Sequence, residues 1–287
     1  MKIPYIASEY KPLFRPEKYG NYVNDHCIIR KDGEYHLFGI TSQTSHPYDE
    51  RYFVHAVGEK LDGTMQEVGK SIDRGTLAWS PCIVEKENDF YMFYGPSPSS
   101  LAVSPDLFEW FGYPLKIEDE PVYAMHRDHF VLRKDDGEYI MYVTGIKDRC
   151  GCISVATSKN LLHWQFAGYA LTSGEAAPLK PAWGAFESPY VVHKDGIYYL
   201  FVTYTDCSDE NYNDTLVFAS KDPLHFGCYM GKENPAVPIT TLYAHAPEIL
   251  EADGKTYITT CGWRSKPNPN TGCVSIAELG WKEEKEA

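Results

Sequence analysis

The sequence predicts an all-β fold, namely a five-bladed β-propeller whose blades of four antiparallel strands surround a central channel. Three observations support this prediction. One hairpin pattern occurs five times along the 287-residue chain. Its copies recur at a spacing near the roughly 40–50 residues of propeller repeats, and no window of about twelve residues shows sustained helical periodicity. Because the copies cover nearly the whole chain, we expect one propeller domain over residues 1–287.

Each copy consists of an apolar run, a charged turn and a second run centred on tyrosine. An Asp-Gly pair between two β-rich runs is the strongest short hairpin signal. The second copy lacks the glycine and offers Asn88-Asp89 instead, two residues that tolerate turns. The copies span residues 24–39, 80–95, 127–145, 187–204 and 245–262. Their opening residues, which lie 55, 48, 59 and 58 residues apart, are Asp25, Ser80, Asp128, Glu187 and His245.

A third strand and an aromatic residue follow each hairpin. This second pattern covers residues 101–110, 153–164, 216–226 and 274–281, with a weaker version at 53–65. We expect its aromatic residues to pack between blades, and they are Trp110, Trp164, Phe226 and Trp281. Long polar connectors should lie at the channel mouths, where binding residues usually sit. They span residues 42–52, 172–186 and 206–215.

The composition excludes several classes of function. Lys and Arg number 27 against 40 Asp and Glu, and the net charge of −13 disfavours nucleic acid because no basic run compensates for it. No stretch approaches the ~20 apolar residues of a membrane-spanning helix. The N-terminal segment lacks the apolar region of a secretory signal, so we expect a cytoplasmic protein. Eight dilute cysteines indicate small buried residues, and the charged tail 282–287 is expected to be disordered.

The candidate site follows from the propeller geometry. The first strand of each blade lines the central channel, so Asp25, Asp128 and Glu187 should converge there. Aligned on the turns, Asp25 stands directly before the position of Pro189, and Glu187 stands two before it. The longer and earlier side chain suits a proton donor. Glycoside hydrolysis needs one protonated and one ionised carboxyl group, and a third carboxylate nearby raises the pKa of the acid.

The same residues resemble a known family. Trp79-Ser80-Pro81, an Asp opening the first and third hairpins, and a Glu-x-Pro opening the fourth are similar to glycoside hydrolase family 43 and its five-bladed clan. The resemblance covers roughly residues 20–280. By position it implies that Asp25 is the general base, that Asp128 tunes and orients the acid, and that Glu187 is the general acid. It requires no cofactor, but at His245 it implies a channel histidine that in some members helps to hold a central cation, such as a structural calcium ion, or the water shell of that cation.

This chain also departs from the family pattern. Family members usually have Pro after the first and third Asp, whereas this chain has His26 and His129. The triplets around Asp25, Asp128 and Glu187 also resemble, more weakly, those of the fructan-cleaving families 32 and 68, which retain configuration. A carboxyl separation of about 5–5.5 Å would give retention, and one of about 6.5–9.5 Å would give inversion. The chain lacks the extra β-sandwich of the fructan enzymes, which favours inversion.

Other residues are candidates for contacts with substrate. Trp79 and Phe186, next to the second and fourth openings, are expected in the pocket wall. Arg127 could pair with a carboxylate or hold a sugar hydroxyl through its forked donors. Arg264 is expected to reach over the channel, and His245 could contact substrate as well as a metal. Weaker candidates are Trp183, Trp263, His126 and His129, while Glu248 follows Pro247 and is expected to be structural.

These features lead to one principal function and several alternatives. The principal hypothesis is a glycosidase that releases a terminal arabinose, xylose, galactofuranose or fructose from a small oligosaccharide by inversion, with an Asp base and a Glu acid. The alternatives are a retaining β-fructosidase-like hydrolase, a sugar-binding propeller without catalysis, and a phosphorolytic relative that uses Arg127, Arg264 and the histidines. The sequence alone leaves the sugar, the linkage and the oligomeric state open.

Overall fold

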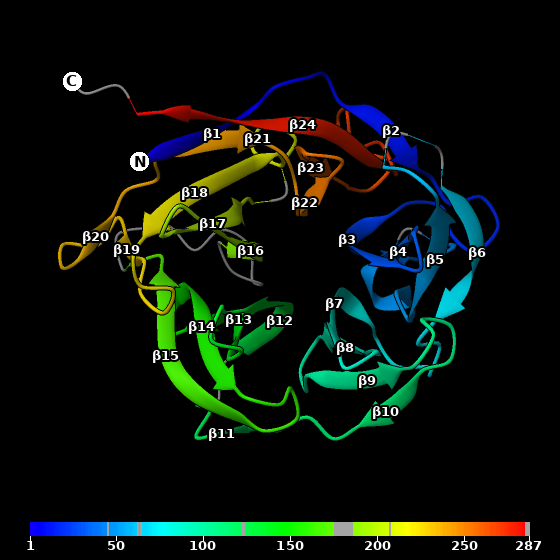
Figure 1. Cartoon of the computed structure of the whole chain (residues 1–287), viewed down its shortest axis with the longest axis horizontal. Helices are drawn as coiled ribbons and strands as arrows, with labels where there is room; N and C mark the ends of the chain where they lie inside the picture. The colour runs from blue at the N-terminus through cyan, green and yellow to red at the C-terminus, as the bar shows by residue number, and fades with distance from the viewer. Residues whose placement is uncertain are drawn as a thin grey trace.

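The fold is a closed arrangement of β-sheets around a central axis, seen end-on in Figure 1. The computed structural model describes residues 1–44, 46–61, 63, 65–121, 124–174, 186–206 and 208–284. Within these residues the strands form five sheets, and the helical content is one 3₁₀ turn, η1 (Pro47–Asp49). No helix in this part of the chain is long and apolar enough to span a membrane. The predicted all-β propeller is confirmed.

The four principal strands of each sheet pair antiparallel, from an innermost strand at the axis to an outermost strand at the rim. The first sheet contains β3 (Asn24–Lys31), β4 (Glu34–Thr41), β5 (Tyr52–Gly58) and β6 (Gln66–Ser71). The second contains β7 (Trp79–Lys86), β8 (Asp89–Gly95), β9 (Ser100–Ser104) and β10 (Phe111–Tyr113). The fourth contains β16 (Phe186–Lys194), β17 (Ile197–Tyr204), β18 (Asp214–Ser220) and β21 (Thr240–Tyr243).

The third and fifth sheets carry additional strands. The third contains β12 (Ala124–Arg133), β13 (Tyr139–Lys147), β14 (Cys150–Ser158) and β15 (Trp164–Thr172), extended by β11 (Ile117–Glu118), β19 (Gly227–Tyr229) and β20 (Pro235–Ala236). The fifth contains β22 (Ile249–Ala252), β23 (Lys255–Thr260) and β24 (Val274–Glu283), completed by β1 (Lys2–Ile6) and β2 (Lys11–Phe14). The innermost strands β3, β7, β12, β16 and β22 surround the centre in Figure 1.

The turns that join the first two strands of each sheet explain the charged motif of the repeats. A two-residue turn that matches the strand twist needs positive φ at both central residues. Asp195 and Gly196 satisfy this with φ of 52° and 74°. In the second sheet the turn residues are Glu87 and Asn88, with φ of 54° and 71°. The predicted Asn88-Asp89 turn is therefore off by one residue, because Asp89 already begins β8.

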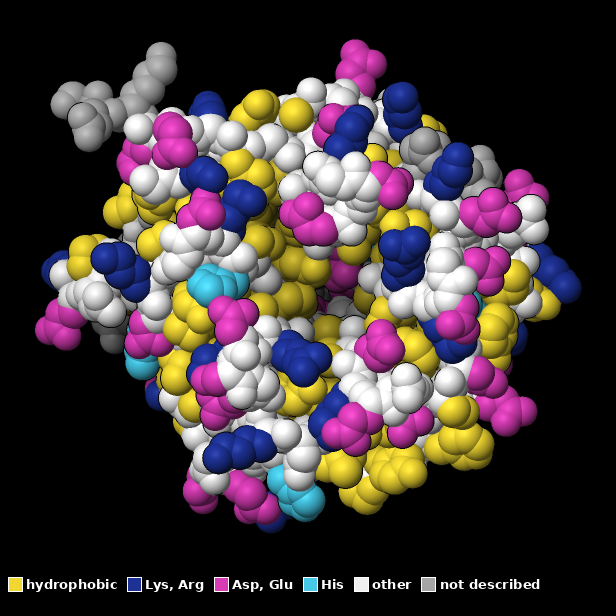
Figure 2. Space-filling view, in the orientation of Figure 1, with side chains coloured by type: hydrophobic (Ala, Val, Ile, Leu, Met, Phe, Trp, Pro, Cys, Tyr) yellow, Lys and Arg dark blue, Asp and Glu magenta, His cyan; other side chains and the backbone are white. Residues whose placement is uncertain are grey.

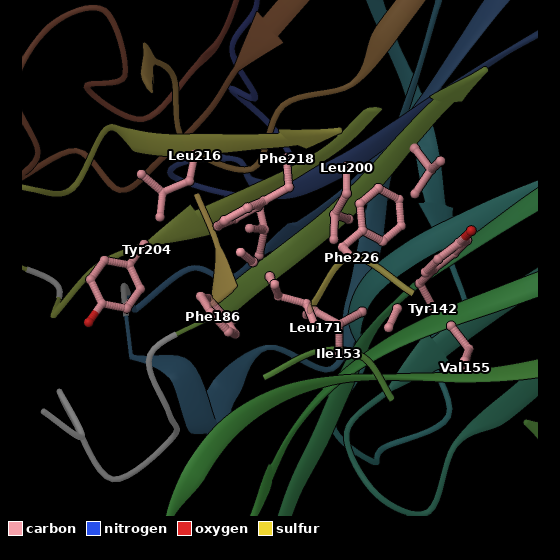
Figure 3. Packing of buried hydrophobic residues seen from close by; sticks show 14 of the residues in the cluster. Tyr142, Ile153, Val155, Leu171, Phe186, Leu200, Tyr204, Leu216, Phe218 and Phe226 are labelled. Carbon is pink, nitrogen blue, oxygen red and sulfur yellow. The ribbon is translucent and has the colours of Figure 1, made fainter. Parts of the chain in front are cut away.

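Five apolar clusters fill the spaces between neighbouring sheets. One lies between the third and fourth sheets, where Tyr142 and Ile153 face Leu200 and Phe218 across the interface (Figure 3). Each of the other four joins another pair of neighbouring sheets, and one of them joins the fifth sheet to the first. Burial of apolar area on both faces explains the nearly continuous apolar runs of the hairpins.

The predicted aromatic residues pack between sheets as expected. Trp164 of the third sheet meets Phe93 of the second edge-to-face, with ring centroids 5.6 Å apart. Trp281 of the fifth sheet meets Tyr199 of the fourth at 4.9 Å. The five buried cysteines with free thiols also fit the prediction, and they are Cys27, Cys82, Cys152, Cys261 and Cys273.

The ring is closed by pairing strands from the two ends of the chain. β1 runs antiparallel to β24, with Lys2 opposite Glu283 and Ile6 opposite Leu279. In Figure 1 both strands lie side by side at the rim. The predicted disordered tail therefore starts too early, because Lys282 and Glu283 belong to β24 and are held by this pairing.

Candidate active site

The inner strands share one unusual backbone conformation at their starts. Asp25, Ser80, Asp128, Ser188 and Ala246 have φ of 29°, 50°, 55°, 49° and 46°. In β3, β7, β12 and β16 this residue lies within a shift of strand register, as in a β-bulge. A non-glycine residue with positive φ costs energy and is concentrated at functional sites. We call these five residues the bulge ring.

The bulge ring confirms the alignment inferred from the repeats. Asp25 and Asp128 belong to the ring, whereas Glu187 stands one residue before it, at the place that Arg127 occupies in β12. Since all inner strands run in the same direction from this level, Glu187 and Arg127 lie nearer the strand starts than the two aspartates do. The site therefore has two layers, with aspartates and serines in one and Glu187 with Arg127 in the other.

The two aspartates are joined by the serines of the ring. The Ser80 Oγ lies 2.5 Å from Asp25 Oδ2 and 2.6 Å from Asp128 Oδ1. The Ser188 Oγ donates to Asp25 Oδ1 at 3.2 Å, and the Ser188 backbone N–H donates to Asp128 Oδ2 at 3.1 Å. Every carboxylate oxygen of the two aspartates thus has a partner. The predicted convergence of Asp25 and Asp128 in the channel is present in the structure.

Arg127 connects the aspartates to the third predicted carboxyl. Its Nη2 donates to Glu187 Oε1 at 3.1 Å, and its Nε lies 3.3 Å from Asp128 Oδ2. The Arg127 and Glu187 side chains are 7% and 13% exposed, so these ion pairs are poorly screened by solvent. The structure therefore places Arg127 on carboxylates, which was one of its two predicted uses.

The electrostatics separate the two carboxyls that glycoside hydrolysis requires. Burial, followed by the negative charge of Asp128, raises the pKa of Asp25 to about 6. Burial also raises the pKa of Glu187 to about 7. The positive charge of Arg127 lowers this pKa, and the negative charge of Asp128 raises it further. Between these pH values Asp25 is mostly ionised and Glu187 is mostly protonated, as a base and an acid need to be.

His245 borders the same site but does not fit a directly bound calcium ion. Its Nδ1–H donates to the Tyr212 carbonyl at 2.9 Å, and its ring stacks on Tyr212 with centroids 3.9 Å apart. Calcium prefers six to eight oxygen ligands. The described part of the chain contains no group of three His, Cys, Asp or Glu side chains arranged to hold a metal ion. No catalytic step is therefore assigned to a metal at His245.

The predicted pocket wall is only partly supported. Trp79 is half-buried at the start of β7 and packs on the core between the first two sheets. The prediction that Phe186 lines the pocket is wrong, because its ring is wholly buried in the core between the third and fourth sheets (Figure 3). Trp263 contacts Tyr22 at a centroid distance of 6.1 Å. Trp183 lies outside the described residues.

Arg264 is not part of the carboxyl cluster. Its side chain is exposed, and its Nε donates to the carbonyl of Asn21, in the segment that leads into β3. This contact occupies the guanidinium at the edge of the first sheet. The prediction that Arg264 binds substrate remains a prediction.

The channel contains a cavity of about 30 Å³ on the side of the bulge ring toward which the inner strands continue. This volume is enough for one or two water molecules. Asp25, Asp128, His26, His129 and Glu248 contribute to its lining. Figure 2 shows the hollow centre of one face of the molecule. Burial raises the pKa of Glu248 to about 8. Glu248 thus lies on the cavity side of the ring, and its structural role stays a prediction.

The histidines that replace proline are held by specific hydrogen bonds. His26 Nε2 lies 2.8 Å from Thr259 Oγ1. His129 Nε2 lies 2.7 Å from Ser99 Oγ, which is 3.2 Å from His126 Nδ1. Burial lowers the pKa of His26, His126 and His129 to about 3, so the rings are neutral. Neither His126 nor His129 has a recorded hydrogen bond to the three predicted catalytic carboxyls.

Three polar residues of the site were not singled out by the sequence analysis. Ser80 and Ser188 hold both aspartates, and Glu50 accepts a hydrogen bond of 2.6 Å from the buried Tyr22 hydroxyl. Burial raises the pKa of Glu50 to about 8, with Asp25 among the contributing charges. The position of Ser80 in the repeat register was the signal for its role. Glu50 lies in the connector 42–52, which was predicted at a channel mouth, but nothing in the sequence distinguished it from the other polar residues of that connector.

Comparison with known proteins agrees with this geometry. The model of glycosyl hydrolases family 43 matches residues 119–280. The chain belongs to this family. The matched segment of this family 43 member includes Arg127, Asp128 and Glu187. Asp25 lies before that segment. The protein is therefore a glycoside hydrolase, and a search of curated proteins gave no match.

Several solved structures share the fold of this family 43 member at low sequence identity. A β-xylosidase/α-arabinofuranosidase from a compost microbial metagenome, in complex with xylotriose, is 17% identical with a TM-score of 0.64, covering 96% of this chain and 95% of its own. An exo-1,5-α-L-arabinanase from a bovine ruminal metagenomic library is 17% identical with a TM-score of 0.59, covering 92% and 95%. An endo-1,4-β-xylanase from Bacteroides thetaiotaomicron is 17% identical with a TM-score of 0.65, covering 97% and 97%.

Proposed function

We propose that the five sheets are the blades of an inverting glycosidase that releases a terminal pentose, xylose or arabinose, from a small oligosaccharide. The observation that carries the proposal is the meeting of Asp25, Asp128 and Glu187 in adjoining layers of one buried site, linked through Ser80 and Arg127. The sugar class is supported by the xylosidase, arabinofuranosidase and arabinanase activities named for the structural neighbours. Galactofuranose and fructose have no such support.

In the proposed single displacement, Asp25 accepts a proton from water as that water attacks the anomeric carbon. Glu187 donates its proton to the leaving oxygen on the opposite face of the sugar. Asp128 orients Arg127 through the 3.3 Å contact, and Arg127 holds Glu187. The negative charge of Asp128 keeps the pKa of Glu187 raised, so that the acid is protonated when substrate binds.

The role of Glu187 can be separated from a structural role by the leaving group. Glu187→Gln should lower kcat roughly 10²–10⁴-fold for a xylo- or arabino-oligosaccharide, but less for an aryl glycoside whose activated leaving group needs little protonation. Asp25→Asn should lower kcat for both substrates to a similar extent, because both need an activated water. The measurement is steady-state kinetics of both variants on both substrates.

Glu248→Gln is the matched control, since it neutralises another buried Glu with a raised pKa on the cavity side of the ring. We expect its kcat to stay close to that of the wild type. An equal loss for Glu187→Gln on both substrates would contradict its assignment as the acid. Proton NMR of the first sugar released tests the stereochemistry, and a product with retained configuration would replace inversion by the fructosidase-like mechanism.

A further inference from the structure

The contacts of Ser80 are not those of an ordinary serine hydrogen bond. Its oxygen is within 2.6 Å of a carboxylate oxygen on either side, Asp25 Oδ2 and Asp128 Oδ1. Distances of 2.5–2.7 Å are typical of charge-assisted O–H···O⁻ hydrogen bonds. A hydroxyl has one proton and two acceptor lone pairs. If both aspartates were ionised, one of the two short contacts would set a lone pair of Ser80 against a carboxylate.

Before turnover both aspartates are ionised and one of these contacts is unfavourable. The arrangement becomes satisfied when one aspartate carries a proton, as it does after Asp25 has accepted one from water. That carboxyl then donates to the Ser80 oxygen, while the Ser80 hydroxyl donates to the other aspartate. The carboxylate oxygens that do not face Ser80 already accept hydrogen bonds. Asp25 Oδ1 accepts one from the Ser188 hydroxyl, and Asp128 Oδ2 accepts one from the Ser188 N–H. The proton is thereby confined to the two oxygens that face Ser80. Ser80 is 6% exposed, so water does not readily replace this link.

We propose that Ser80 makes Asp25 and Asp128 one proton-sharing pair, through which the base passes its proton during turnover. This rests on the proposed function. After Asp25 has taken a proton from water, Asp25 Oδ2–H donates that proton to Ser80 Oγ. At the same time the O–H bond of Ser80 breaks and its proton moves to Asp128 Oδ1. Asp25 is then ionised, Asp128 is neutral, and Ser80 remains a hydroxyl.

The transfer couples the base to the acid. Asp128 in its charged form raises the pKa of Glu187, which favours the protonated acid before reaction. Once Asp128 has become neutral, this contribution disappears. Glu187, which has just given its proton to the leaving sugar, is then easier to keep as an anion beside Arg127. The starting state returns when Asp128 releases its proton to solvent and Glu187 takes up a proton from solvent.

Several other charged or titratable groups surround the pair of aspartates. Arg127 contacts Asp128, while His245 contributes electrostatically to both aspartates and Glu187 to Asp25. Across the cavity stand His26, His129 and Glu248. The two histidines are neutral with pKa values near 3, and Glu248, with a pKa near 8, is protonated below neutral pH. None of them makes a recorded hydrogen bond to the aspartate oxygens that face Ser80.

The chain provides a matched pair of variants for the test. Ser80→Ala removes the hydroxyl that joins the aspartates, whereas Ser188→Ala removes a hydroxyl that touches Asp25 alone and keeps the backbone donor to Asp128. Both lie in the bulge ring with similar φ.

The first measurement needs no turnover. In protein with ¹³Cγ-labelled aspartate, the Asp25 and Asp128 signals of the wild type should shift with pH in the same two steps, as coupled groups do. In Ser80→Ala each signal should follow its own single step, and Ser188→Ala should keep the shared steps. Independent single steps in the wild type, or loss of the shared steps in both variants alike, would overturn the proposal.

The second measurement is kinetic. Ser80→Ala should lower kcat roughly 10–100-fold with KM nearly unchanged, and Ser188→Ala should lower it only a few-fold. In an Asp128→Asn background the additional effect of Ser80→Ala should vanish, since Ser80 acts through Asp128. Additive effects of the two changes would overturn proton sharing while leaving the hydrolase assignment intact. A wild type that hydrolyses no pentoside would instead contradict the proposed function.

Discussion

At the scale of single residues, the activity of this protein depends on carboxyls whose pKa values are raised by burial. Asp25 and Glu187 have pKa values of about 6 and about 7. The base must be ionised, so activity should rise as pH passes the pKa of Asp25. The acid must be protonated, so activity should fall as pH passes the pKa of Glu187. The prediction is a narrow bell-shaped profile of kcat/KM with its maximum between about pH 6 and 7.

Arg127 provides a directional test of this assignment. Its positive charge lowers the pKa of Glu187, so Arg127→Met should move the alkaline limb of the profile to higher pH, in addition to lowering kcat. The pH dependence of kcat/KM for an aryl glycoside checks this. An alkaline limb that stays in place or moves to lower pH would show that Glu187 is not the group being titrated.

Glu248 should affect stability rather than catalysis. A carboxyl with a raised pKa in the folded state contributes stability that is complete below its ordinary pKa and is lost as pH rises through the folded value, here about 8. Glu248→Gln should therefore leave Tm nearly unchanged near pH 4.5 and raise it by roughly 5 °C near pH 8. Thermal unfolding at the two pH values measures this. A gain confined to low pH would contradict the assigned pKa shift.

The residue scale also shows which parts of the site could be predicted from the sequence. Asp25, Asp128 and Glu187 were found because the repeats place all three at the openings of inner strands, with Glu187 one residue earlier than the two aspartates. Phe186 was misplaced because a repeat gives the position of a residue along a strand but not which face of the sheet its side chain occupies. Ser80 was visible in the register, yet a hydroxyl has no distinctive pattern until its partners are known.

At the scale of elements, close contact between strands of different sheets positions the catalytic groups. Gly95 ends β8, and a Cβ added there would lie 3.1 Å from the Arg127 Cα and 3.2 Å from its Cβ in β12. Gly95→Ala should push the start of β12 outward, destabilise the fold by roughly 1–3 kcal/mol and lower kcat. Denaturant unfolding and kinetics of the variant test both effects.

Gly69 in β6 is the control for that substitution. An added Cβ there meets no atom within 4 Å, so Gly69→Ala should change stability by no more than about 0.5 kcal/mol and leave kcat unchanged. Equal effects of the two substitutions would mean that the approach of β8 to β12 is unimportant. The turn motifs of these elements were predictable, but the bulges were not, because Asp, Ser and Ala all occupy them.

At the scale of the whole molecule, the site exists because the ring is closed. Asp25 comes from the first sheet and Glu187 from the fourth, and between them the fifth sheet is completed by β1. Deletion of residues 1–7 would remove the strand paired with β24 and leave an unpaired edge. We expect a lower Tm and a lower kcat. Addition of a synthetic peptide of residues 1–7 should restore both, and failure of the deletion to alter either would contradict the role of closure.

The repeats predicted the architecture because each copy encodes one sheet, and neighbouring sheets bury their faces against each other. The closure was not predicted. β1 lies outside the repeated pattern, and its five residues, KIPYI, gave no signal of the distant strand with which they pair. Pairing between the ends of a chain depends on the complete ring rather than on local sequence.

The fifth member of the bulge ring has a further consequence. Ala246 shares the backbone conformation of Asp25, Ser80, Asp128 and Ser188 but carries only a methyl group. What the inner strands repeat is thus a backbone platform, and the chemistry depends on which side chain each platform presents. Because the Ala246 methyl group packs in the apolar cluster between the fifth and first sheets, this one platform serves the hydrophobic core, and a larger side chain there would disturb the packing of the fifth sheet against the first before it could add any chemistry.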